Sequence, residues 1–431
     1  MRVMWILGRV PAEAAEATGQ PRSHGGGWQD ALIDSMRSQP GVKLLVAYTG
    51  LRPGQRMTLR GVEFADIGPV EPPGRIARVV ARWRASGSAT AVLDESVRLV
   101  RDWKPHLIHL HGTQWGLGLV TTRVDTPALV SIQEVLSVYA VVAREYRPLH
   151  DRNRFRPAEF ARGLTPWHDA RRLDAAAVQE RVVLRECRCV AGRTAFDERV
   201  AAVLAPQACY VHVGEALRSE FYGPRWEPGH VRAGGVPTIC ASGTDHNYSR
   251  KGVDVAIDAV GILLESGLQV RLSVFGMTPG SAAGRQAMAH AERLGIGEMI
   301  RLPGGLNAAE VVAELLASDA YVLPSRADNS PNSLCEAMML GVPCVASTAG
   351  GIPSLATDGE DALLVPPGDA YSLAGAVRGL LADEGLATRL SAAARKRAAA
   401  RHDPATIREQ LLAAYDATLA TPGRTNEGVA K

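Results

Sequence analysis

Two carboxylates with a spacing suited to ligand binding stand in the segment from Ser325 to Gly341. Asp328 and Glu336 are eight residues apart, and a predicted junction between a loop and a helix falls between them. Carboxylate oxygens accept hydrogen bonds from hydroxyl groups. At this separation the two acids are placed to bind hydroxyls on two neighbouring rings, whereas a pair of hydrolytic acids flanks a single bond. A sugar beside a ribose fits this layout, although a capped helix with two acidic residues is also common without any role in binding.

The helix within this segment is expected to supply an anion site. Ser330 is a favourable N-cap and Pro331 a favourable first helical residue, and Gly341 is a favourable stop. The amides of Asn332 and Ser333 would have no partner within the helix, and the helix dipole adds partial positive charge at this end. Phosphate is a natural ligand for such a helix end.

Two further motifs are suited to phosphate. Lys251, followed by Gly252, opens another predicted helix with a compact positive charge. Three consecutive glycines, Gly25, Gly26 and Gly27, follow the first predicted strand. Without a Cβ their backbone can approach a phosphate or an acceptor closely, although such a run is also typical of an ordinary flexible turn.

A pair of histidines closes one of the predicted strands. Strand alternation places His109 and His111 on the same face. They are candidates for contact with a sugar or an acceptor, and equally for structural histidines with satisfied hydrogen bonds.

Short β-branched runs alternate with longer amphipathic segments along the whole chain, for example the helical patterns at 90–101 and 169–188. This order predicts parallel sheets covered by helices on both faces, which bind ligands beyond the carboxyl ends of their strands. The expected strands are residues 3–7, 42–48, 107–111, 128–132 and 209–213 in the first half, and 238–242, 270–276, 300–304, 321–325, 344–348 and 363–367 in the second.

A length of 431 residues predicts two domains, and a stretch rich in glycine and proline at 222–237 separates the two series of strands. We therefore expect an N-terminal domain at 1–225, a linker at 226–236 and a C-terminal domain at 237–402. A further helix is expected at 403–420 and a flexible tail at 421–431.

Composition excludes several classes of protein. Hydrophobic residues make up 46% of the chain and charged residues 22%, as in globular proteins rather than disordered ones. The six cysteines lack the paired spacing of a zinc site or a disulfide framework. The longest weakly charged stretch, at 127–143, carries Glu134 and favours a strand followed by a core helix over a membrane span. The sequence also lacks the strand–GxGxxG–helix pattern of nicotinamide dehydrogenases.

Charge is distributed unevenly. Residues 1–230 hold 31 basic and 24 acidic residues, whereas residues 231–431 hold 17 and 21. The first half is thus expected to favour anionic partners, either a phosphate-rich acceptor or an anionic membrane surface, unless its charge is simply a solvated face. Its arginine-rich portion at 144–172 lacks aromatic stacking motifs and helix-turn-helix or zinc signatures, so no nucleic-acid partner is expected.

Together these motifs resemble the Glu-x7-Glu signature of retaining glycosyltransferases of family 4, in the form associated with capsular and exopolysaccharide assembly. The residues that carry the signature are Pro324-Ser325, Asp328 in place of the first Glu, Glu336-Ala337, Gly341, Pro343, Val345 and Ser347. Motifs elsewhere agree with it: Lys251-Gly252, Gly350-Gly351-Ile352-Pro353, Ala191-Gly192-Arg193-Thr194, and Glu215 with Leu217-Arg218 and Phe221-Tyr222. The resemblance spans nearly the whole chain and is strongest over 236–370.

The resemblance implies a GT-B fold, in which two Rossmann-like domains face a central cleft and the C-terminal helix crosses back to the N-terminal domain. It also implies metal-independent transfer of a sugar, with retention of configuration, from a nucleoside-diphosphate donor to a glycan, lipid-linked or small-molecule acceptor. No cofactor and no metal ligand are expected. The expected location is the cytoplasm, and the basic residues of the N-terminal half make peripheral binding at the inner face of the membrane a candidate.

By the same resemblance, Asp328 would hold hydroxyls of the donor sugar, Glu336 the nucleotide ribose and Lys251 the diphosphate, so these three are the expected catalytic residues. The expected donor-binding residues are Gly25, Gly26, Gly27, Arg250, Lys251, Asp328, Asn329, Ser330, Asn332, Ser333, Leu334 and Glu336. The expected acceptor-side residues are His109, His111, Gln133 and Arg193.

Three positions depart from the family pattern. Asp328 is one methylene shorter than the usual Glu, His246 stands where many relatives have an Arg, and Gln133 stands where relatives often have a His. Gln binds hydroxyls but cannot act as a base. Two alternatives stay open: a scaffold that binds sugar nucleotides without turnover, and a GT-B sugar-nucleotide epimerase.

Overall fold

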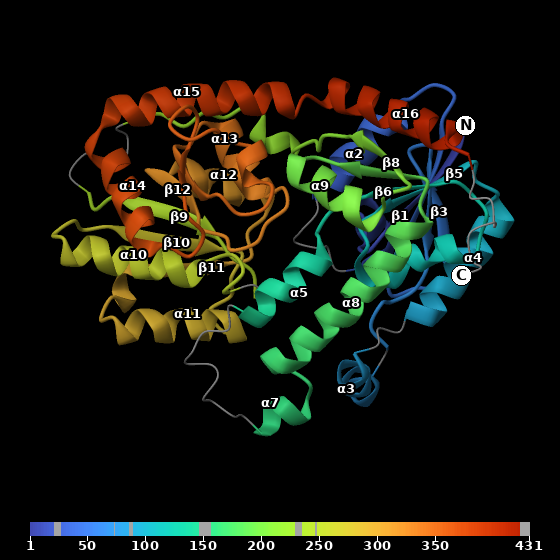
Figure 1. The fold of residues 1–431 in the computed structure, drawn as a ribbon, viewed down its shortest axis with the longest axis horizontal. Coiled ribbons are helices and arrows are strands. Elements are labelled where there is room, and N and C mark those ends of the chain that lie inside the picture. The colour runs from blue at the N-terminus through green and yellow to red at the C-terminus, as the bar shows by residue number, and fades with distance from the viewer. Residues whose placement is uncertain are drawn as a thin grey trace. The chain divides into compact units, whose positions relative to one another are not determined.

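The computed structural model describes residues 1–20, 27–72, 74–85, 89–145, 157–228, 235–245 and 248–422 (Figure 1). They form two compact units. The first unit joins residues 1–216 to the C-terminal segment that begins at Pro404, and the second comprises Leu217–Asp403. Each unit has its own sheet and its own hydrophobic core.

The described residues of the first unit form one sheet. Its strands are β1 (Arg2–Leu7), β2 (Lys43–Tyr48), β3 (Arg56–Leu59), β4 (Val62–Asp66), β5 (Leu107–His111), β6 (Ala128–Ser131), β7 (Cys189–Gly192) and β8 (Cys209–His212). Over the described residues they follow the order β3-β4-β2-β1-β5-β6-β7-β8. Only the β3–β4 pair is antiparallel. The central strands β1 and β5 are almost completely buried, as expected for parallel strands covered by helices, although His109 and His111 put polar side chains on one face of β5.

The helices of the first unit include the last helix of the chain. They are α1 (Ala12–Thr18), α2 (Gly27–Arg37), α3 (Arg75–Arg84), α4 (Ala89–Trp103), α5 (Leu136–Glu145), α7 (Pro157–Ala161), α8 (Pro166–Glu186), α9 (Ala195–Leu204), α16 (Pro404–Ala420) and the 3₁₀ segment η1 (Gln114–Thr122). Ile407, Leu411, Ala414 and Tyr415 of α16 are buried in a core cluster with residues of β1, β2 and α2.

The sheet of the second unit is parallel throughout. Its strands are β9 (Thr238–Ser242), β10 (Arg271–Phe275), β11 (Ile300–Gly304), β12 (Ala320–Leu323), β13 (Cys344–Ser347) and β14 (Leu363–Val365). Over the described residues they follow the order β11-β10-β9-β12-β13-β14. Numbered within this unit, that order is 3-2-1-4-5-6, the doubly wound arrangement of Rossmann folds.

Helices lie on both faces of this second sheet, with α10 and α11 on one side and α12 and α13 on the other (Figure 1). The helices are α10 (Val253–Glu265), α11 (Ala282–Arg293), α12 (Ala308–Leu316), α13 (Asn332–Leu340), α14 (Ala370–Ala382) and α15 (Glu384–Arg401), with 3₁₀ turns η2 (Ser219–Phe221), η3 (Gly297–Met299) and η4 (Ile352–Ser354). The strand order reverses between β9 and β12, so the loops that follow these strands lie side by side at one edge of the sheet.

The boundary between the two units lies closer to the N-terminus than the glycine- and proline-rich stretch predicts. The division falls after Ala216 rather than after residue 225. Phe221 and Trp226 belong to the core of the second unit, and the backbone and indole N–H groups of Trp226 donate to Leu340 and Ser318, each at 2.8 Å. The segment that precedes the expected linker is thus part of the second unit. Of the expected tail, residues 423–431 lie outside the described residues.

The strands expected from the sequence all form, with ends that differ by at most two residues. The expectation omits three strands of the first unit, β3, β4 and β7. β7 has only four residues and follows directly on α8, whose pattern was expected to continue to residue 188.

Candidate functional site

In the second unit, the loops after β9 and β12 bring two predicted site residues together. The Nζ atom of Lys251 donates to Oδ2 of Asp328 at 2.7 Å, and the Ser325 hydroxyl donates to the same oxygen at 3.0 Å. The Asp328 side chain is 7% exposed and that of Lys251 14%. Their pairing lies at the reversal of strand order, where ligands of such sheets bind.

Two glycines allow the loops after β9 and β13 to approach the loop after β12. Gly252 has a φ of 69°, and a Cβ there would lie 2.0 Å from the carbonyl oxygen of Pro324. Gly350 has a φ of 54°, and a Cβ there would lie 2.0 Å from the carbonyl oxygen of Asp328. Any other residue would push the neighbouring loop away, so both glycines hold Asp328 in place.

Opposing effects set the charge of Asp328. Burial raises the pKa of its carboxyl group, but the charges of Lys251 and Arg250 and the hydrogen bonds from Lys251 and Ser325 outweigh burial and leave the pKa below its usual value. Asp328 is therefore an anion at neutral pH. Among the described residues, no donor to its Oδ1 atom is found, so this oxygen has capacity for a ligand hydroxyl.

The helix that follows, α13, begins one residue later than predicted. Pro331 is its N-cap, with a φ of −69° and a ψ of 109°, and no side chain caps it. The prediction that Ser330 is the N-cap is wrong, because the extended conformation of Pro331 leaves Ser330 outside the helix. The predicted stop is confirmed: Gly341 has a φ of 80°, and its N–H bonds back to Ala337 and Met338.

The side chains of the first turn of α13 differ in what they offer a ligand. The Ser333 hydroxyl accepts hydrogen bonds from Tyr321 at 2.7 Å and Ser242 at 3.0 Å, and these hydroxyls fix it above the sheet. Asn332 is partly exposed. Leu334, expected at the donor site, instead packs fully buried in the core, and its N–H donates to Pro331.

Glu336 is held by an arginine that precedes the second sheet. Nε and Nη2 of Arg218 donate to its two carboxylate oxygens at 2.8 Å and 2.9 Å. The Arg218 guanidinium also lies 4.7 Å from the centre of the Phe221 ring. Burial raises the pKa of Glu336, and Arg218 offsets this only in part. Each oxygen of a carboxylate can accept two hydrogen bonds, so capacity for ribose hydroxyls is left.

Arg250, Asn329 and Gly27 are further expected donor residues that the structure describes. Arg250 donates through Nη1 to the carbonyl of Ala327 at 3.4 Å, and Asn329 is 1% exposed. Gly27 is the first residue of α2, whereas Gly25, Gly26 and His246 lie outside the described residues.

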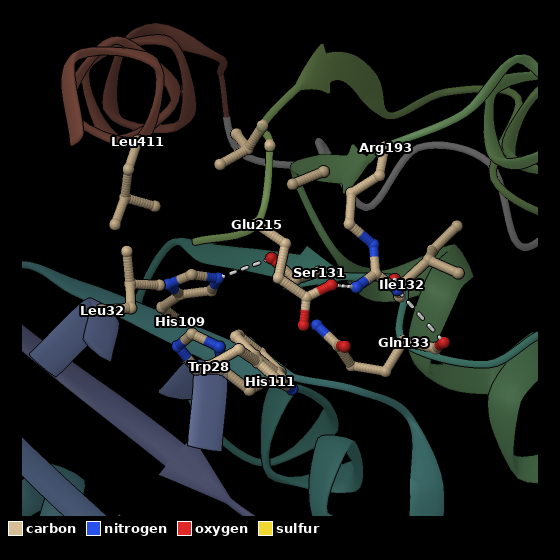
Figure 2. A pocket seen from close by; sticks show the side chains of 13 residues that line it. Trp28, Leu32, His109, His111, Ser131, Ile132, Gln133, Arg193, Glu215 and Leu411 are labelled. Atoms are coloured by element: carbon tan, nitrogen blue, oxygen red, sulfur yellow. Dashed lines mark hydrogen bonds and ion pairs between the residues drawn. The ribbon is translucent and has the colours of Figure 1, made fainter. Parts of the chain in front are cut away.

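In the first unit, all four predicted acceptor-side residues line one pocket at the carboxyl ends of β5, β6 and β7 (Figure 2). The cavity volume is about 20 Å³, which holds a water molecule but not a sugar ring. Figure 2 shows the side chains of Gln133 and Arg193 beside that of Glu215, and a dashed line joins His109 to Ser131. The structure thus assembles His109, His111, Gln133 and Arg193, and their contact with an acceptor stays a prediction.

The two histidines share a face, as strand alternation predicts, with ring centres 3.9 Å apart. Nδ1 of His109 lies 3.0 Å from the Tyr415 hydroxyl, and its Nε2 lies 2.8 Å from the Ser131 hydroxyl. Burial lowers the pKa of His109 to about 3 and lowers that of His111 well below its usual value, with added repulsion from His109 and Arg9. Both rings are therefore neutral at physiological pH.

Arg193 forms a buried ion pair with Glu215 at the same pocket. Its Nη2 atom also donates to the carbonyl groups of Ile132 at 3.2 Å and Gln133 at 3.3 Å. Arg193 is thus already engaged within the protein, and it fixes the backbone that carries Gln133.

Glu215 and Arg218 are polar residues of these sites that sequence reasoning did not select. Both stand in a motif that matched the family pattern, Glu215-Ala216-Leu217-Arg218, and the motif was the only signal available. The partner of Arg218, Glu336, lies 118 residues away in the sequence.

In the part of the chain that the structure describes, no group of three or more His, Cys, Asp or Glu side chains is arranged to hold a metal ion. No helix described by the structure is both long and apolar enough to span a membrane.

Comparison with known proteins identifies the second unit. Residues 231–397 match the family described as glycosyl transferases group 1. They form a group 1 glycosyl transferase domain. This domain covers β9 to β14 and contains Lys251, Asp328 and Glu336.

Curated relatives are similar to different extents of the chain. The chain is 33% identical over 150 residues to the putative colanic acid biosynthesis glycosyltransferase WcaL of Salmonella typhimurium. This match covers 33% of this chain and 36% of that relative. The match therefore spans little more than a third of WcaL. The 2-deoxystreptamine glucosyltransferase of Streptomyces kanamyceticus is 28% identical over 310 residues, which cover 68% of this chain and 72% of that relative.

A solved structure shares the fold over both units. The complex of Anabaena Alr3699/HepE with UDP-glucose superposes with a TM-score of 0.66 at 16% identity, covering 96% of this chain and 99% of that one. The predicted α/β class and GT-B fold are thereby confirmed. The resemblance to glycosyltransferases of exopolysaccharide assembly is likewise supported by the group 1 glycosyl transferase domain and by WcaL.

Proposed function

We propose that the chain is a glycosyltransferase that moves a sugar from a nucleoside diphosphate to an acceptor hydroxyl. The observation that carries the proposal is the buried pairing of Lys251 with Asp328 at the switch point of a group 1 glycosyl transferase domain. A cation and an anion at the mouth of a short helix match the two ends of a sugar nucleotide, since the diphosphate needs positive charge and the sugar needs acceptors for its hydroxyls.

Each polar group of the site has a role in this proposal. Lys251 keeps two of its three N–H donors for the diphosphate, and Oδ1 of Asp328 accepts from a sugar hydroxyl. The two remaining acceptor positions of Glu336 bind the ribose. The first amides of α13 add partial positive charge near the phosphates.

The reaction breaks the bond between the anomeric carbon and the diphosphate oxygen and forms one between that carbon and the acceptor oxygen. The departing diphosphate oxygen takes the acceptor proton, and attack on the face that the diphosphate leaves gives retention. Lys251 and the start of α13 stabilise the charge that develops on the leaving group. Because these groups supply the countercharge, we propose that no metal is required.

Polysaccharide assembly is the proposed setting, because the chain is 33% identical over 150 residues to WcaL, which is described as a putative colanic acid biosynthesis glycosyltransferase. The proposed donor is a nucleoside-diphosphate sugar, since HepE was solved with UDP-glucose. The proposed location is the cytoplasm, where such donors would be available.

A donor screen tests the proposal. Purified protein is incubated with a panel of labelled nucleoside-diphosphate sugars, with and without EDTA, and the products are separated by chromatography. Release of free nucleoside diphosphate and labelled sugar, unchanged by EDTA, is expected from slow hydrolysis of the true donor. Interconversion of two sugar nucleotides would instead establish an epimerase, and tight binding without turnover would establish a scaffold. Loss of turnover with EDTA would refute only the proposal that no metal is required, and the proposed sugar transfer would stand.

A further inference from the structure

Helix α3 (Arg75–Arg84) is the most unusual surface element of the first unit. Its sequence, RIARVVARWR, contains four arginines and no acidic residue, and none of its residues is buried. A ten-residue helix in a globular protein normally buries one face, and most of its stability comes from that burial. Helix α3 lies at the margin of the unit beside α8 (Figure 1).

The apolar residues of α3 form a stripe. Ile76, Val79, Val80 and Trp83 recur at intervals of three and four residues, so they share one side of the helix. Ile76 is 80% exposed and Val80 is 41% exposed. The apolar stripe thus faces solvent over the first two turns of the helix.

The C-terminal end of α3 is anchored by Trp83. Its indole N–H donates to the carbonyl of Ala161 at 3.1 Å, and its ring packs edge-on against Phe160 and His168 at centre distances of 5.0 Å and 4.6 Å. The Arg171 guanidinium donates to the carbonyl of Trp83 at 3.1 Å. These contacts hold α3 in a defined position although its apolar stripe is uncovered.

The turn between α7 and α8 extends the same surface. Leu164 is 46% exposed and Trp167 is 42% exposed, and the Arg171 guanidinium lies 4.7 Å from the centre of the Trp167 ring. Residues 75–84 and 157–172 together contain seven arginines and two acidic residues, one of which, Asp169, pairs with Arg172. We call these two segments the α3 surface.

We propose that the α3 surface docks the protein on an anionic lipid bilayer. Arginines that flank an exposed stripe containing Ile and Trp are typical of helices that lie in the headgroup region, with the apolar side chains inserted and the guanidinium groups bound to lipid phosphates. A second copy of the chain is disfavoured as the occupant, since two such surfaces would repel each other. This inference is independent of the proposed reaction, because docking requires neither donor nor acceptor.

Vesicle co-sedimentation of the full chain tests the proposal. Vesicles of phosphatidylcholine alone are compared with vesicles that contain phosphatidylglycerol, at low and high salt. We expect binding that rises with phosphatidylglycerol content and weakens with salt, because the arginines act through a screened field. The double substitution Arg75→Gln with Arg78→Gln should lower the partition coefficient about 30-fold.

Matched control variants test whether vesicle binding depends on the α3 surface itself or on any exposed arginine or apolar side chain. Arg185→Gln with Arg199→Gln removes the same charge from exposed positions outside the α3 surface, and should lower binding far less. Ile76→Ser with Val80→Ser should lower it at least about tenfold. Val203→Ser with Leu294→Ser is the apolar control, since these residues are 76% and 45% exposed elsewhere.

The proposal is overturned if the chain does not sediment with anionic vesicles, or if it binds neutral ones equally well. It is also overturned if the α3 variants bind like their controls. Because the substituted side chains are exposed, melting temperatures should match those of the unsubstituted chain. Donor hydrolysis in the absence of vesicles should also be unchanged in every variant, so failed docking and failed catalysis are distinguishable.

Discussion

Removing Arg218 should destabilise the second unit, because it leaves the buried carboxylate of Glu336 without its ion-pair partner. The substitution Arg218→Met keeps the bulk of the side chain over Phe221 but deletes both hydrogen bonds to Glu336. The side chains of Glu336 and Arg218 are 8% and 20% exposed. Breaking a buried ion pair typically costs 3–5 kcal/mol, and the partial exposure of Arg218 favours a value of about 3 kcal/mol at neutral pH.

The loss of stability caused by Arg218→Met should increase with pH. Burial already raises the pKa of Glu336, and loss of Arg218 must raise it further. A carboxyl group whose pKa is higher in the folded than in the unfolded state favours folding at low pH, and this contribution is lost as the pH rises through the folded-state pKa. The destabilisation by Arg218→Met should therefore be small at pH 5 and largest at pH 8.

Differential scanning calorimetry of the full chain measures this effect. For a unit of this size, 3 kcal/mol corresponds to a fall of roughly 6–12 °C in melting temperature. Only the transition of the second unit should move, so the first unit serves as an internal reference. Adding Glu336→Gln should remove the pH dependence and recover part of the loss, because a neutral amide carries no buried charge. An equal loss at pH 5 and pH 8, or no recovery in the double variant, would refute the reasoning.

Three other outcomes are expected. Lys251→Met should lower donor turnover at least about 100-fold, measured as release of nucleoside diphosphate, if its ammonium group stabilises the leaving group; turnover near the original value would contradict that role. Gly252→Ala should destabilise the second unit by about 2 kcal/mol or more in thermal unfolding, because the added Cβ meets the Pro324 carbonyl and φ is positive; an unchanged melting temperature would show that the loops can move apart. His109 has a pKa lowered to about 3, so it stays neutral in the folded state while the unfolded chain takes up a proton below about pH 6.5. Stability of the first unit should fall by about 1.4 kcal/mol per pH unit from this residue as the pH drops from 6 to 4, and His109→Gln should flatten that slope.

Hydrophobic periodicity was sufficient to predict the second sheet. Its six strands are short apolar runs separated by long helical patterns, so a local signal exists for each one. β7 was missed because it has only four residues and the helical pattern of α8, which ends at Glu186, was expected to continue to residue 188. The hairpin of β3 and β4 was missed as well: β3 is half exposed and contains few apolar residues, and it pairs at the edge of the sheet.

The residues of the candidate site could be predicted from local motifs, but the pairs that they form could not. Asp328, Glu336 and Lys251 stand in local motifs, but the pairing of Lys251 with Asp328 joins residues 77 positions apart and that of Glu336 with Arg218 joins residues 118 apart. Only the folded strand order brings such pairs together. The helix cap was wrongly placed at Ser330 because residue preferences do not reveal the ψ angle that Pro331 adopts.

The position of α16 has a consequence for how the chain can acquire its structure during synthesis. The Tyr415 hydroxyl lies 2.8 Å from the indole nitrogen of Trp5 and 3.0 Å from Nδ1 of His109, and the side chain is completely buried. A ribosome makes Trp5 before the second unit, and Tyr415 only after the entire second unit has been translated. The apolar face that α16 covers in the first unit therefore stays exposed until this helix has been made. The pocket around His109 and His111 is completed last, although the strands that line it are made much earlier.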